Sequence, residues 1–400
     1  MNRILTTHTG SLIRPLELES DLIRREQGQL VNEQSFGAAL RDGVAAVMRE
    51  QADNGLDIVN DGEFDKNSWI TYIYYRVTGI ETREYAFDPE RVLEAIPPTF
   101  DRTRTGNVRE ELNRFVPFYA RDWSSGIGTG WVCTSPISYK PEAIDAHLAD
   151  VRAAADKLGQ AADTLDRPVF ITAMSPGSLH WIRNEYYESE EEFVFAFADA
   201  LRQEYLRIID AGFLLQVDDA VLWRQRATIT MQGGTQRDYD AWADVRVAAL
   251  NRALEGIPTE RIRYHVCSGS GHEAKVVDAG LRQVLPAILK VRWGSLLVEQ
   301  ANAGHEHEWA AWRDFALPEG RMLVPGVVTH HTHVVEHPDL VTQRLVRLAG
   351  VVGPDRIMAG TDCGFAQTAG KSRVQLWTQW AKLRALVAGA AQASAELWPR

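Results

Sequence analysis

Three residues in the second half of the chain have side chains that commonly bind a transition metal. His265 and Cys267 are two positions apart in the strand-like run 262–267. Alternate residues of a β-strand point to the same face, so both side chains can reach one ion. Zinc prefers nitrogen and sulfur donors. The His-x-Cys pair alone is a weak signal, and Cys363, which follows another strand-like run, strengthens it.

Reactive side chains also stand at the ends of most other strand-like runs. These are His8 and Ser11, Asp61 and Glu63, Asp218 and Asp219, Glu299, His330, His331 and His333, and Asp362. In a (β/α)8 barrel the catalytic groups lie at the C-terminal ends of the strands. A scatter of surface residues would not fall at the same end of each strand, so we expect one site built from these residues.

Short apolar runs alternate with amphipathic segments along the chain. The strand candidates are 4–9, 56–61, 130–135, 168–173, 213–218, 262–267, 295–300, 322–328 and 356–361, and the helix patterns are 38–54, 141–165, 190–211, 239–254, 338–348 and 374–397. This alternation indicates an α/β protein with a parallel sheet and predicts a (β/α)8 TIM barrel. One of the nine strand candidates must then be a capping or inserted strand. An open doubly wound sheet is the alternative, but no dinucleotide-type glycine loop follows the first strand.

Residues from about 82 to 122 interrupt this rhythm after the second strand. The segment is polar, rich in Arg and Glu, and contains Pro97-Pro98. Two interpretations stay open, a lid over the site and a surface excursion without a role. We find no internal repeat, low-complexity tract or linker, so the sequence predicts a single catalytic barrel domain over residues 1–400.

Composition excludes several classes of partner. The 400 residues are 45% hydrophobic, which is enough for a large core, and the formal net charge of -11 disfavours nucleic acid. No apolar run of 18 residues or more is present, so no membrane span is expected. The N-terminus lacks a signal-peptide pattern and the three cysteines fit a reducing compartment, so we expect a cytoplasmic protein. The oligomeric state stays open, with a homo-oligomer among the options.

Several of these motifs together resemble the cobalamin-independent methionine synthase superfamily. They are Thr6-Thr-His-Thr-Gly-Ser11, Leu215-Gln-Val-Asp-Asp219, Tyr264-His-Val-Cys267, Leu297-Val-Glu299 and Thr361-Asp-Cys-Gly364. The resemblance runs from about residue 5 to 370 in the family's order and covers the catalytic C-terminal barrel of the long synthases. Ser175-Pro-Gly177, Asn184-Glu-Tyr-Tyr187 and Glu299-Gln-Ala-Asn302 are similar to a short branch that includes the epoxyalkane:coenzyme M transferases.

The resemblance implies a role for each of the motif residues. It implies that His265, Cys267, Glu299 and Cys363 bind Zn2+, that Glu63 and Asp218 line a thiol pocket where the synthases hold the homocysteine amino group, and that Gly10 and Ser11 contact the carboxylate. His331 aligns with a histidine proposed as a proton donor. His8 and Asp219, which lie within these motifs, complete the predicted substrate-binding set.

These residue types suit the alkylation of a small thiol. The thiolate is the nucleophilic form, and zinc lowers the pKa of a thiol enough to deprotonate it. A substrate thiolate would add negative charge to an already anionic ligand set, so we expect Glu299 to be the exchangeable, catalytic ligand. His331 has a suitable pKa to protonate the leaving group. The expected partners are therefore a homocysteine-like or coenzyme-M-like thiol and an alkyl donor, either a methyl donor or an epoxide.

Two departures from the family leave the donor open. The synthases carry a Trp after the fourth strand that helps to receive folate, whereas this chain reads Met174-Ser-Pro-Gly-Ser-Leu-His180. Short-branch relatives tend to have Asp and Lys where this chain has Thr329 and His331. Two alternatives remain: a lyase or decarboxylase on a related barrel, such as the uroporphyrinogen decarboxylases, which need no zinc, and a non-catalytic zinc-binding protein with a closed site.

Overall fold

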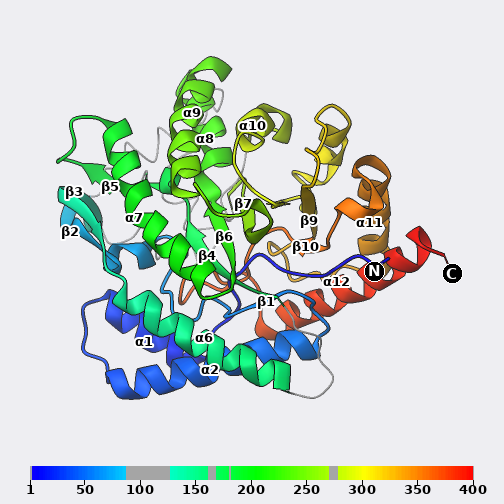
Figure 1. The fold of residues 1–400 in the computed structure, drawn as a ribbon, viewed down its shortest axis with the longest axis horizontal. Helices are drawn as coiled ribbons and strands as arrows, with labels where there is room; N and C mark the ends of the chain where they lie inside the picture. Colours follow the sequence, from blue (N-terminus) through cyan, green and yellow to red (C-terminus); the bar gives the residue numbers. More distant parts are fainter. Residues whose placement is uncertain (1, 87–126, 161–167, 180–181, 270–277, 400) are drawn as a thin grey trace, which may run out of the picture.

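A parallel sheet of seven strands forms the centre of the protein (Figure 1). The computed structural model describes residues 2–86, 127–160, 168–179, 182–269 and 278–399. The strands, in spatial order, are β1 (Val59–Asn60), β4 (Val169–Met174), β6 (Leu214–Asp219), β7 (Ile262–Val266), β8 (Ser295–Val298), β9 (Met322–Val328) and β10 (Gly360–Thr361). They are buried almost throughout, which explains why their sequences are nearly continuous apolar runs.

The N-terminal segment contacts both edges of this sheet. Thr6 forms a parallel bridge with Ala359, which precedes β10. The Thr6 carbonyl oxygen also accepts hydrogen bonds from the backbone amides of Asp57 and Ile58, just before β1. Because β1 and β10 are the edge strands, these contacts curl the sheet toward closure. The TIM-barrel-like fold predicted from the sequence is confirmed, with 4–9 present as a bridging segment and not as a full strand.

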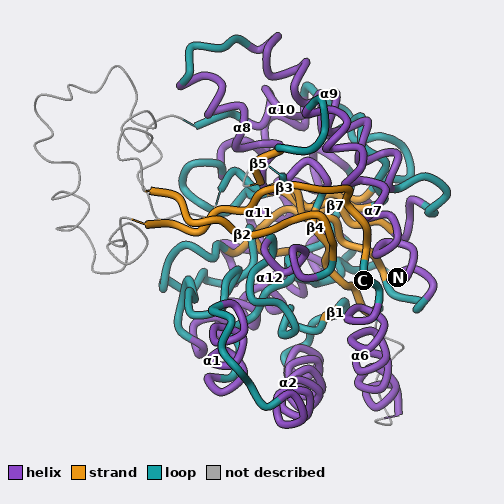
Figure 2. Tube along the Cα trace, turned by 90° about the vertical axis from the view of Figure 1, so that its left-hand side faces the viewer, coloured by secondary structure: helices purple, strands orange, loops and turns teal. Residues whose placement is uncertain are grey.

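Helices surround the strands, as Figure 2 shows. They are α1 (Leu16–Glu26), α2 (Glu33–Asp53), α6 (Glu142–Gln160), α7 (Glu190–Asp210), α8 (Ala220–Met231), α9 (Gln236–Ala253), α10 (Leu281–Ile288), α11 (Pro338–Val352) and α12 (Leu376–Leu397). Among the described residues, no helix is long and apolar enough to cross a membrane. The α2 helix begins five residues before the predicted start at residue 38, because the Asn32 side chain caps it by accepting from the amides of Gln34 and Ser35.

A second, smaller sheet stands apart from the barrel strands. It contains β2 (Val77–Ala86), antiparallel to β3 (Ile127–Tyr139), with β5 (Ile182–Asn184) beside β3. The candidate strand 130–135 lies in β3, so it is the inserted member of the nine candidates. Most of the predicted insertion, residues 82–122, lies outside the described residues, and a lid there stays a prediction.

A buried carboxylate fastens this hairpin to the barrel wall. Glu204 on α7 accepts hydrogen bonds from the hydroxyl groups of Tyr72 and Tyr139 and from Nη1 of Arg76, at 3.1, 2.7 and 2.9 Å. The Glu204 side chain is fully buried, and Arg76 is nearly so. A charge in such a place stabilises the fold only while its partners are present.

We expect Glu204→Ala to lower the free energy of unfolding by about 3–5 kcal/mol, the usual cost of breaking a buried ion pair. Urea denaturation would measure it. The matched control on the same helix is Glu190→Ala, because Glu190 pairs with Arg246 but is 55% exposed, and its loss should cost less than about 1 kcal/mol. Equal losses for the two variants would show that burial of the Glu204 cluster does not stabilise the fold.

Candidate functional site

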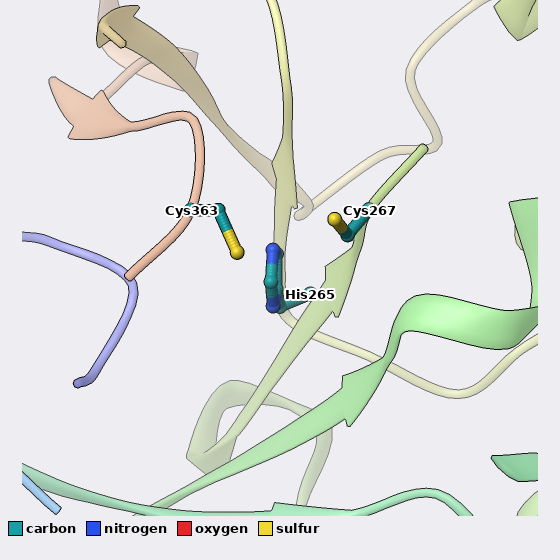
Figure 3. A group of neighbouring side chains, drawn as sticks. All are labelled: His265, Cys267 and Cys363. Atoms are coloured by element: carbon teal, nitrogen blue, oxygen red, sulfur yellow. The ribbon is translucent and has the colours of Figure 1, made fainter. Parts of the chain in front are cut away.

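Three side chains from two strands, β7 and β10, converge at the C-terminal end of the sheet. His265 lies in β7, Cys267 follows it, and Cys363 follows β10. One ligand atom of each lies within 4.8 Å of the other two, and Figure 3 shows the three side chains facing one another. All three residues are buried. The structure therefore brings together three of the four predicted metal ligands as one cluster.

The imidazole of His265 is oriented from behind by a carboxylate. Its Nδ1 lies 2.9 Å from Oδ1 of Asp218, the residue paired with His265 in the neighbouring strand β6. Its Nε2 is buried and has no nitrogen or oxygen partner among the described residues. Burial lowers the pKa of His265, but the hydrogen bonds with Asp218 and Cys363 raise it to about 10. Metal-binding histidines are typically held by a carboxylate in this way.

The pKa values of the two thiols are shifted in opposite directions. The hydrogen bond between them, followed by burial, raises the pKa of Cys267 well above its usual value. The same hydrogen bond, with His265 and His330 nearby, lowers the pKa of Cys363 well below its usual value. The cluster thus favours a thiolate at Cys363, and a buried thiolate needs a positive charge beside it.

Glu299, the fourth predicted ligand, touches the cluster through Cys267. The Cys267 sulfur lies 2.9 Å from Oε1 of Glu299, which is fully buried after β8. Ser268 donates to this carboxylate from its backbone amide and its hydroxyl, at 3.2 and 3.1 Å, and Asn302 donates from Nδ2 at 2.8 Å. One imidazole nitrogen, two sulfurs and a carboxylate oxygen are a donor set that suits zinc. The residues present therefore fit the ion that the sequence predicts.

The predicted thiol-pocket residue Glu63 is held in an unusual backbone conformation. Its φ is 59°, in the left-handed region, and the residue is buried. Its carboxylate lies against Gly10, where a Cβ atom would collide with Oε1. Oε2 has no hydrogen-bond partner among the described residues. Burial raises the pKa of Glu63 to about 8, with Lys66 opposing and Asp218 adding to the shift.

Gly10 and Ser11 lie between Glu63 and the segment that carries Cys363. Gly10 contacts Glu63, and a Cβ atom on Gly364, the neighbour of Cys363, would collide with the Ser11 hydroxyl. The backbone of Ser11 also accepts a hydrogen bond from Phe365 at 2.8 Å. Gly10 and Ser11, which are predicted to contact the carboxylate of the substrate, thus lie between the Glu63 side chain and the segment that carries Cys363. A substrate that reached from Glu63 to the metal ligands would pass these two residues.

The other two predicted substrate residues already have protein partners. His8 Nδ1 accepts from the Gly10 amide at 3.3 Å, and Nε2 lies 2.8 Å from the Gln51 side-chain oxygen. Burial lowers the pKa of His8 to about 4, so the ring is neutral. Asp219 accepts from the backbone amide of Leu222, which caps α8, and from the Tyr264 hydroxyl. Both residues order the backbone beside the site, and their contact with a substrate stays a prediction.

Two consecutive histidines follow β9. His330 is fully buried and contributes to the lowered pKa of Cys363. His331, the predicted proton donor, is half-buried, and its ring centroid lies 4.0 Å from that of His330. Sequence reasoning favoured His331, whereas His330 is the histidine whose charge contributes to the lowered pKa of Cys363. The role of His331 stays a prediction.

Asp362, which the sequence places among the reactive strand-end residues without assigning it a role, supports the predicted ligand Glu299. Asp362 is fully buried, and one of its oxygens accepts from the amides of Gln300 and Ala301, both at 2.8 Å. Burial and the nearby Glu299 raise its pKa to about 7. Asp362 thus fixes the loop that carries Glu299, and its position between Thr361 and Cys363 was the available signal.

Comparisons with known proteins identify the family of the chain. A family model described as the catalytic domain of cobalamin-independent synthase matches residues 106–391. A methionine synthase of Sulfolobus acidocaldarius is 22% identical over 90% of this chain and 85% of its own length. The uncharacterized protein YxjH of Bacillus subtilis is 23% identical over 95% and 92%.

Solved structures share the fold over the whole chain. A B12-independent methionine synthase from Shewanella sp. W3-18-1, in complex with selenomethionine, has a TM-score of 0.71 at 19% identity and 99% coverage of both chains. A putative vitamin-B12 independent methionine synthase from Listeria monocytogenes has a TM-score of 0.65 at 16% identity and 100% coverage of both. Because the family model spans most of the sequence, the chain belongs to the cobalamin-independent synthase family, whose catalytic domain it carries.

Proposed function

We propose that the protein transfers a methyl group to the thiol of homocysteine or a close analogue, in a zinc-dependent and vitamin-B12-independent reaction. The observation that carries the proposal is the pairing of two unlike groups in one site. The cluster of His265, Cys267 and Cys363 suits a thiol-activating metal, and the neighbouring carboxylates of Glu63 and Asp218 suit an amino group. A thiol-containing amino acid presents both chemistries.

His265, Cys267, Cys363 and Glu299 would hold the zinc ion, which when bound lowers the pKa of a substrate thiol so that the thiolate predominates. The rest of the chain orients these residues. Asp218 fixes the ring of His265, and Ser268 with Asn302 fixes the carboxylate of Glu299. Glu299 remains our candidate for the ligand that yields to substrate, because its departure would offset the negative charge that a substrate thiolate adds to the ligand set.

The amino group of the substrate would bind where two buried carboxylates repel each other. Asp218 raises the pKa of Glu63, and Oε2 of Glu63 has no partner among the described residues. An ammonium ion offers the missing donors and relieves the repulsion, so it stabilises the ionised form of Glu63. The carboxylate of the substrate would then face Gly10 and Ser11.

In the transfer step the sulfur–methyl bond forms as the bond between the methyl group and the donor breaks. The donor atom that leaves takes up a proton, for which we propose His331. The donor itself is a small molecule. The names of the Sulfolobus and Shewanella proteins favour methyl transfer over the epoxide-opening and lyase alternatives.

The test measures metal content and thiol chemistry on the same purified protein. We expect about one zinc per chain by mass spectrometry. Calorimetry should show homocysteine binding with proton release, and isotope-labelled methyl donors, including methyltetrahydrofolate, should be screened for methionine formation. Zinc-free protein that binds no thiol would reject the proposal, and zinc-containing protein with no thiol binding would favour a closed, non-catalytic site.

A further inference from the structure

Glu63 has a backbone conformation that the surrounding structure must hold in place. Among the described residues it is the one non-glycine residue with a positive φ. A side chain rarely adopts this region unless neighbouring contacts fix it, and such residues cluster at functional sites. The position of the Glu63 carboxylate therefore depends on whatever holds its backbone.

Two hydrogen bonds in series hold that backbone from the side of helix α6. The amide of Glu63 donates to Oδ1 of Asp61 at 3.1 Å. The other oxygen of Asp61 lies 2.6 Å from Nε2 of His147 on α6. Asp61 and His147 are both buried. From the opposite side, Nη2 of Arg14 donates to the Glu63 carbonyl at 2.9 Å.

We propose that His147 is a positioning residue that, through Asp61, holds the Glu63 carboxylate where it receives the amino group of the substrate. This inference rests on the proposed function for its account of what Glu63 binds. The route from His147 to Glu63 runs through Asp61, whose two oxygens contact His147 and the Glu63 amide. His147 lies 86 positions after Asp61 in the sequence.

The charges around His147 explain why a histidine suits this position. It faces Asp61 at 2.6 Å and Asp65 at 3.6 Å, while Arg76 pairs with Asp65 from the other side. The two carboxylates raise the pKa of His147 against the effect of burial, so the ring donates to Asp61. Loss of the ring would leave Asp61 buried without its strongest partner, and Asp61 would hold the Glu63 amide less firmly.

A substitution at His147 should meet no steric obstacle. The residue lines a cavity of about 400 Å3 between α1, α2 and α6, next to Phe36 and Leu40. Shorter side chains can therefore replace it without a clash. We choose His147→Leu, which removes the donor, and His147→Gln, whose side-chain amide can restore a hydrogen bond to Asp61.

The kinetic test compares two thiols that differ only in the amino group, homocysteine and 4-sulfanylbutanoate. His147→Leu should raise KM for homocysteine about tenfold, the size of one lost charge-assisted hydrogen bond, and leave KM for the other thiol unchanged. His147→Gln should recover most of the loss, and zinc content should stay at the wild-type level. Equal losses for both thiols would overturn the proposal, because they indicate a general structural defect.

A double-mutant cycle and hydrogen exchange complete the test. If His147 acts only through Glu63, adding His147→Leu to Glu63→Gln should cost nothing further, and additive losses would overturn the proposal. The Glu63 amide should exchange its hydrogen at least several-fold faster in His147→Leu than in the wild type, and unchanged exchange would also overturn it. If the wild type binds neither thiol, the proposed function fails, and hydrogen exchange still decides whether His147 orders Glu63.

Discussion

Replacing Cys363 by serine should remove both bound zinc and methyl transfer. The Cys363 thiol has a pKa well below its usual value because Cys267 and His265 stabilise its anion, and a serine hydroxyl stays protonated there. Loss of one member of a buried charge pair costs about 3–5 kcal/mol, which corresponds to a change on the order of a thousandfold in affinity or rate. Metal analysis and a methyl-transfer assay would measure the two effects.

Cys133→Ser is the matched control for this experiment. Cys133 is also fully buried, but it lies in β3, where its thiol contacts the Ser135 carbonyl at 3.5 Å. It does not belong to the His265, Cys267 and Cys363 cluster. The control should lose some stability and keep its zinc. A Cys363→Ser protein that retains zinc and full activity would show that the cluster is not the metal site.

The three clustered ligands could be predicted because each follows from a local rule. His265 and Cys267 share a face because they are two apart in one strand. Cys363 joins them because all parallel strands of the sheet end on the same side. These rules need only the strand positions, and the sequence located β7 correctly, from Ile262, since the strand is a continuous buried run.

The residues that support the ligands could not be predicted in this way. His147 reaches Asp61 from helix α6, and the angle at which a helix packs on the sheet is not written in any short motif. His331 was favoured over the neighbouring His330, because positions that follow a strand differ in burial only once the loop is folded. Helix α8 was missed because its apolar residues lack a helical repeat and it ends in the β-branched residues Thr228 to Thr230.

The sequence also overestimated the regularity of the barrel. Segment 4–9 has strand composition, yet Thr6 makes one isolated bridge, because Asp57 satisfies its amide and its hydroxyl with a side chain. The run 130–135 has the same composition and pairs outside the barrel, in the hairpin with β2. Strand propensity depends on what the pleated surface packs against, so composition could not separate the two cases.

Asp218→Asn should weaken zinc binding about 10- to 100-fold, the usual cost of losing a carboxylate behind a metal-binding histidine. An asparagine can still contact Nδ1 of His265, but it lacks the charge that raises the basicity of the ring. The same substitution removes a carboxylate that faces Glu63, so KM for homocysteine should also rise. Metal competition with a chelator and steady-state kinetics would measure both. Unchanged zinc affinity would contradict the role assigned to Asp218.

Asp219→Asn provides a control with the same chemical change one residue further on. Adjacent residues of a strand point to opposite faces: Asp218 contacts His265, whereas Asp219 contacts Tyr264 and caps α8. Asparagine caps helices as well as aspartate does, so zinc affinity and KM should both stay near the wild-type values. A raised KM with normal zinc content would instead support the substrate contact that the sequence predicts for Asp219. The pair of variants therefore separates the face of β6 that serves the metal from the face that serves the fold.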